Sequence, residues 1–143
     1  MATERRAEVT WTGDLMSGGG TIDSVGSGAF GPLDVSWAAR SEEPNGKTSP
    51  EELIAAAWAA CFAMALSAGL ARGGTPPERL ATSATVTFQP GEGIIKGALT
   101  VRGTVPGIDA AGFDSAAQGA KENCPVSMAL TGIPEITLDA ALD

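Results

Sequence analysis

The sequence contains no histidine and no tyrosine, and it has only two cysteines, Cys61 and Cys124. Without histidine, the chain lacks the commonest general base and the Ser-His-Asp and Cys-His pairs of many hydrolases. Two cysteines without histidine also fall short of a typical zinc ligand set, so we expect no metal site. Thiol redox chemistry is the class of reactivity that these absences leave open.

Composition sets the class of protein. The 143 residues are 43% hydrophobic and carry a net charge of −8, which fits one domain over residues 1–143 and argues against nucleic acid or an anionic membrane as partner. The first ten residues lack the apolar stretch of a secretory signal, so we expect a cytoplasmic protein in which a disulfide is transient and functional. The apolar segment 53–70 is interpreted as a buried helix rather than a membrane span.

Hydrophobic periodicity predicts an α+β domain. Alternation predicts a meander of short strands over residues 7–12, 21–25 and 33–37, with a loop over 40–47. Ser49, Pro50 and Glu52 form the start signal of a long helix, which ends at Gly73. A hairpin over 80–89 and 94–105 follows, then a helix capped by Asp109, a short helix beginning at Cys124-Pro125, and a strand over 133–142.

Each cysteine has a structural interpretation beside the chemical one. Cys61 lies about three turns into the long helix among apolar residues, where a free cysteine often serves as a small hydrophobic side chain. Cys124 precedes Pro125 and therefore falls at a helix N-cap, where exposed amides and the helix dipole favour a thiolate. The spacing alone does not show whether the two thiols meet.

Two charged residues, Glu51 and Arg40, are further candidates for a role in the site. Glu51 and Glu52 occupy the first turn of the long helix, where both complement its dipole and Glu52 completes a capping box. Glu51 is ten residues from Cys61, a rise of roughly 15 Å along a helix, so it would serve a thiol on a partner subunit. Arg40, predicted at the end of the third strand, is a surface residue or the cation that stabilises a thiolate.

These segments resemble the OsmC/Ohr family of hydroperoxide reductases, and the osmotically inducible OsmC branch more than the Ohr branch. The resemblance is carried by residues 49–66 around Cys61 and by residues 120–130 around Cys124. It continues through the Trp-Thr-Gly-Asp sequence from Trp11, through 105–110 and through 136–139, and so covers nearly the whole chain. One departure is Trp58, which stands where many OsmC-like sequences have histidine.

The resemblance implies an intertwined homodimer in which antiparallel sheets wrap two long hydrophobic helices and the active sites lie at the subunit interface. It implies that Cys61 is the peroxidatic thiolate and Cys124 the resolving thiol, with Arg40 and Glu51 as their charged partners. It further implies an organic hydroperoxide as substrate, an external dithiol of the lipoyl type as reductant, no prosthetic group, and a role in oxidative and osmotic stress. The apolar surroundings of Cys61 predict a substrate pocket formed by Trp58, Phe62 and Met64.

Two alternatives stay open at this stage. The cysteines could exchange disulfides with protein dithiols and never meet a peroxide, although the chain has no Cys-x-x-Cys motif. Alternatively, the chain could form a dimeric binding protein for a small apolar ligand, with both cysteines structural.

Overall fold

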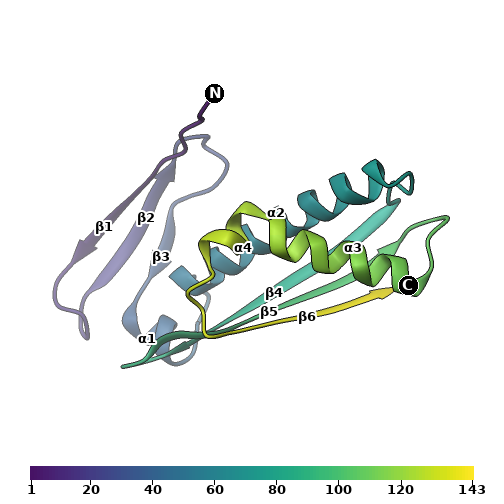
Figure 1. The fold of residues 1–143 in the computed structure, drawn as a ribbon. Helices are drawn as coiled ribbons and strands as arrows, with labels where there is room; N and C mark the ends of the chain where they lie inside the picture. Colours follow the sequence, from purple (N-terminus) through teal and green to yellow (C-terminus); the bar gives the residue numbers. More distant parts are fainter. The chain divides into compact units, whose positions relative to one another are not determined.

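The computed structural model describes residues 1–143, and the chain divides into two compact units, Met1–Leu53 and Ile54–Asp143 (Figure 1). The long helix α2, Pro50–Arg72, begins in the first unit and continues through the second. The two units are therefore described in turn. A single domain over the whole chain stays a prediction.

The first unit contains a meander of three antiparallel strands. β1 (Ala7–Thr12), β2 (Gly19–Val25) and β3 (Leu33–Val35) form a sheet in the order β1-β2-β3, which confirms the predicted meander. Helix α1 (Trp37–Ser41) follows, because the Ser36 hydroxyl accepts a hydrogen bond from the Ala39 amide and caps a helix there. The predicted extension of the third strand to Trp37 was wrong, and Arg40 lies on α1 instead of at a strand end.

The start of α2 follows the predicted capping signal. The Glu52 amide donates to the Ser49 hydroxyl at 3.1 Å, and Pro50 is the first helical residue. The Glu52 carboxylate accepts from the Thr48 hydroxyl at 3.0 Å and not from the Ser49 amide, so only one of the two hydrogen bonds of the predicted capping box forms. The helix ends at Arg72, and Gly74 follows with a φ of +87°, a left-handed conformation suited to glycine.

The second unit contains a three-stranded mixed sheet. β4 (Arg79–Gln89) and β5 (Gly93–Thr104) form the predicted antiparallel hairpin. β6 (Glu135–Leu142) pairs with β5 in parallel, so the expectation of purely antiparallel sheets does not hold for this edge. The reason is the crossover through α3 (Ala110–Asn123) and α4 (Pro125–Ala129), which returns the chain to the end where β5 began. Figure 1 shows α3 and α2 on the same side of this sheet.

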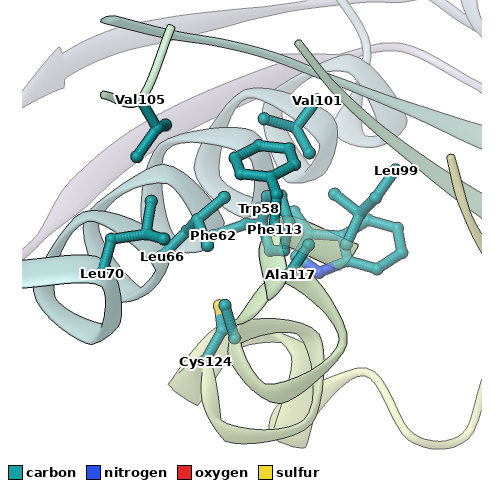
Figure 2. Packing of buried hydrophobic residues seen from close by; sticks show 11 residues of the cluster. Trp58, Phe62, Leu66, Leu70, Leu99, Val101, Val105, Phe113, Ala117 and Cys124 are labelled. Carbon is teal, nitrogen blue, oxygen red and sulfur yellow. The ribbon is translucent and has the colours of Figure 1, made fainter. Parts of the chain in front are cut away.

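One face of α2 forms the core of the second unit (Figure 2). Its buried side chains recur every four residues, as Trp58, Phe62, Leu66 and Leu70. They pack against β5 and α3, where the buried partners include Leu99, Val101, Phe113 and Ala117. Because four residues make slightly more than one helical turn, this spacing keeps all four side chains on one stripe.

The opposite face of α2 is apolar and exposed. It consists of Ala56, Ala57, Ala60, Met64, Ala68 and Ala71, and Met64 retains 72% of its accessible surface. With both faces apolar, α2 is long and apolar enough to cross a membrane by length and composition, a test that core helices of soluble proteins also pass. The apolar segment 53–70 is helical as predicted, and within one chain only one of its faces is buried.

Candidate active site

The fold of the second unit brings the two cysteines together. Cys124 Sγ lies 2.8 Å from Cys61 Sγ, although 63 residues separate them in the sequence, and both are free thiols. Cys61 projects from α2 about three turns after its start and is partly exposed, whereas Cys124 is completely buried between α3 and α4. Two thiols this close need only a small movement to form a disulfide.

The local structure around Cys124 follows from its neighbours. Its amide donates to the Ala120 carbonyl and closes α3, while the residue itself is the N-cap of α4 with Pro125 at the next position. The proline fixes a backbone conformation suited to the first helical residue. The predicted start of a short helix at Cys124-Pro125 is therefore confirmed, and the sulfur lies beside the free amides of α4.

The two thiols differ in acidity. The pKa of Cys61 is raised above its ordinary value, first because burial disfavours the thiolate and second because of its hydrogen bond with the Cys124 thiol. Burial also opposes ionisation of Cys124, but the hydrogen bond with Cys61 and the amide and hydroxyl of Ser127 outweigh burial and lower the pKa of Cys124.

Ser127 is a site residue that the sequence reasoning missed. It is 6% exposed, lies on the first turn of α4 three residues after Cys124, and accepts a 2.7 Å hydrogen bond from the indole N–H of Trp58. The available signal was its spacing, because residues at the N-cap and three positions later face each other at a helix start.

Arg40 and Glu51 form an ion pair within the first unit. Arg40 Nη2 donates to Glu51 Oε1 at 2.7 Å, and Arg40 Nε donates to the two carboxylate oxygens at 3.0 and 3.1 Å. Glu51 is 6% exposed, and Arg40 is partly exposed. The planar guanidinium thus holds a buried carboxylate by the fork geometry that lysine cannot provide.

The three predicted pocket residues lie in different surroundings. Trp58 and Phe62 are completely buried in the core, and Met64 is exposed on the opposite face of α2. A cavity of about 390 Å³ opens instead between α2 and α3, lined by Ala65, Ala68, Gly69, Arg72, Ala116, Gly119, Ala120 and Asn123. None of the three lines this cavity, and their role in a substrate pocket stays a prediction. No group of three or more cysteine, aspartate and glutamate residues is arranged to hold a metal ion.

Comparison with known proteins establishes the family. The model of the OsmC family, described as OsmC-like protein, matches residues 43–139. The chain is 43% identical over 145 residues to Peroxiredoxin OsmC of Escherichia coli (strain K12), with 99% of both proteins covered, and equally similar to Peroxiredoxin OsmC of Shigella flexneri. The chain therefore belongs to the OsmC family.

Solved structures show the same fold. A crystal structure of an organic hydroperoxide resistance protein OsmC from Legionella pneumophila matches with a TM-score of 0.70 at 24% identity, covering 95% of this chain and 96% of that one. An organic hydroperoxide resistance protein from Elizabethkingia anophelis matches with a TM-score of 0.71 at 22% identity over the full length of both chains. The predicted α+β fold with a long hydrophobic helix is confirmed.

Proposed function

We propose that this protein is a thiol-dependent peroxidase that reduces organic hydroperoxides to alcohols, and hydrogen peroxide more weakly. The observation that carries the proposal is the 2.8 Å approach of Cys61 and Cys124 in a chain that belongs to the OsmC family. The 43% identity to a protein named Peroxiredoxin OsmC, over nearly the full length of both, supports the same activity.

The reaction has three steps. The Cys61 thiolate attacks the peroxide oxygen that is not bonded to carbon, the O–O bond breaks, and the alkoxide leaves and takes a proton as the alcohol. Cys61 is now a sulfenic acid, which Cys124 attacks to form the Cys61–Cys124 disulfide with loss of water. An external dithiol, for which a lipoyl-type compound is our candidate, then reduces the disulfide by two exchange steps and is itself oxidised.

Cys61 needs a cation to act as the attacking thiolate, because the fold of one chain raises its pKa. We assign this role to Arg40, held in place by Glu51, since a guanidinium stabilises both the thiolate and the charge that develops on the leaving oxygen. The ion pair that buries the Glu51 carboxylate supports this assignment, because it fixes the direction of the guanidinium.

We further propose a homodimer in which each active site receives Arg40 and Glu51 from the other subunit. The exposed apolar face of α2 supports this state, because a contiguous apolar surface is stabilised when a second copy covers it. Met64→Asp places a charge in the centre of that face. We expect this variant to be a monomer by sedimentation and to lose peroxidase activity, whereas the exposed Met128→Asp on α4 serves as the control.

The preferred substrate is apolar. The cavity between α2 and α3 is lined by Ala65 and Ala120, each four residues from a cysteine along its helix. Its lining is mainly alanine and glycine, and it accepts an alkyl or aryl group more readily than a strongly hydrated molecule. We place the reaction in the cytoplasm, where reducing conditions return the disulfide to thiols after each turnover.

Steady-state assays with a lipoyl-type dithiol test the function. We expect a higher kcat/KM for cumene hydroperoxide than for hydrogen peroxide, complete loss of turnover in Cys61→Ser, and loss of disulfide formation in Cys124→Ser. If wild-type protein reduces neither peroxide, the proposal is refuted and a binding protein with structural cysteines is favoured.

A further inference from the structure

A buried hydrogen bond connects the core of the second unit to Ser127, three residues after the proposed resolving thiol, and the inference drawn from it rests on the proposed peroxidase function. Trp58 Nε1 donates to Ser127 Oγ at 2.7 Å, across 69 residues of sequence. An indole N–H is a donor only, so the Ser127 oxygen must be the acceptor. The serine therefore keeps its own proton available for a second partner. Cys124 lies three residues before Ser127 at the start of α4.

The indole is held firmly in this position. Trp58 has no accessible surface, and one edge of its ring lies against Gly97 on β5. A Cβ atom at Gly97 would lie only 2.6 Å from Trp58 Cζ3, so the glycine is what lets the ring approach the strand. Because the ring cannot turn toward water, its N–H depends on Ser127 for a partner.

We propose that Trp58 is a positioning residue for Cys124: its N–H holds the Ser127 hydroxyl so that this hydroxyl donates its proton to the Cys124 sulfur. In this proposed relay, Ser127 acts on the reacting sulfur and Trp58 acts through Ser127. The buried environment strengthens both hydrogen bonds, because no water competes for the donors. The hydroxyl of Ser127 is also one of the groups that favour the charged form of Cys124.

The hydrogen bond affects the second step of the reaction. The Cys124 thiolate attacks the sulfur of the Cys61 sulfenic acid, an S–S bond forms, the S–O bond breaks, and the departing hydroxide takes a proton to become water. A more acidic thiol is ionised more completely but is a weaker nucleophile once ionised. At a pH below the thiol pKa the greater ionisation dominates, so a tenfold increase in acidity raises the rate of disulfide formation by roughly threefold. At a pH above the thiol pKa the thiol is already ionised, so only the weaker nucleophilicity remains and a more acidic thiol reacts more slowly.

The test compares Ser127→Ala, Trp58→Phe and the double variant with wild-type protein. Ser127→Thr retains the hydroxyl, and Thr82→Val is a matched control that removes another hydroxyl bonded to α2, at the Ala59 carbonyl. Thiolate absorbance against pH, recorded in a Cys61→Ser background, follows Cys124 alone because the chain has no other cysteine and no tyrosine. Stopped-flow oxidation with cumene hydroperoxide in the two-cysteine proteins measures the rate of disulfide formation.

We expect Ser127→Ala and Trp58→Phe to raise the pKa of Cys124 and to slow disulfide formation at a pH below that pKa, by roughly threefold for each tenfold loss of acidity. At a pH above the pKa, both variants should form the disulfide faster than wild-type protein. The double variant should match Ser127→Ala, because Trp58 acts through the serine. Ser127→Thr and Thr82→Val should titrate like the parent protein. A merely structural role would lower stability without this reversal of the pH profile.

The inference is overturned if the titration of Cys124 is unchanged in Ser127→Ala, or if the two substitutions raise its pKa additively. If Trp58→Phe does not fold, comparing the Cys124 titration of Ser127→Ala with that of Ser127→Thr still decides whether the hydroxyl acts on Cys124. Trp58→Leu then tests the role of the indole. If wild-type protein forms no disulfide with peroxide, the proposed function fails. The thiolate titration still tests the proposed hydrogen bonds from Trp58 to Ser127 and from Ser127 to Cys124, because the titration requires no peroxide.

Discussion

Oxidation of the thiol pair should stabilise the second unit by an amount that the sequence separation sets. Cys61 and Cys124 are 63 residues apart, and a disulfide that closes a loop of this length removes enough chain entropy from the unfolded state to add about 4 kcal/mol to stability. The sulfur atoms already lie 2.8 Å apart and must approach to about 2.05 Å, so the native structure needs little rearrangement. We therefore expect most of this gain to be realised.

Scanning calorimetry of the oxidised and reduced protein measures the effect. For a chain of this size, about 4 kcal/mol corresponds to a rise in Tm of about 10 °C. Cys124→Ser, treated with the same peroxide, should show no such rise. An oxidised protein that unfolds at the same or a lower temperature than the reduced one would refute the reasoning. It would mean that the bond forms only when the fold around α2 and α4 is distorted.

Three further outcomes follow from the packing and the charges. Gly97→Ala should destabilise the protein by about 1–3 kcal/mol in urea unfolding, because its Cβ would collide with the Trp58 ring. Arg40→Met should cost about 3 kcal/mol, since it leaves the Glu51 carboxylate buried and unpaired, and Glu51→Gln in the same chain should recover part of that loss. A hydrogen bond from Arg102 lowers the pKa of Asp139. The ionised carboxylate therefore contributes stability at a pH above the ordinary carboxyl pKa, and this contribution disappears as the pH falls through the lowered pKa. Asp139→Asn removes this contribution and should make the loss of stability with acid less steep.

Much of the local structure could be predicted, because its causes lie close together in the sequence. Ser49 and Asp109 each accept an amide hydrogen bond from the residue three positions later, and the corresponding helices begin where these residues predict. Cys124-Pro125 likewise starts α4 as expected. In contrast, α1 was missed because its first residue, Trp37, continues the alternating pattern of β3, and because residues 40–47 were interpreted as a loop. Only the cap at Ser36 indicates the helix.

The features that depend on tertiary packing could not be predicted from the residues alone. The parallel pairing of β6 with β5 depends on the path of the crossover, which hydrophobic alternation does not encode. The contact between Trp58 and Ser127 joins α2 to α4 across 69 residues, and nothing in either local sequence indicates it. The approach of the two thiols was implied by the family resemblance and left open by the spacing.

Intact mass combined with free-thiol counting tests the central claim most directly. Fully reduced protein is treated with one equivalent of cumene hydroperoxide in the absence of any reductant. Our account predicts rapid loss of both thiols and of two hydrogen atoms per chain, no such change in Cys61→Ser, and accumulation of sulfenic acid at Cys61 in Cys124→Ser. Two unreacted thiols in the wild-type protein would contradict the account.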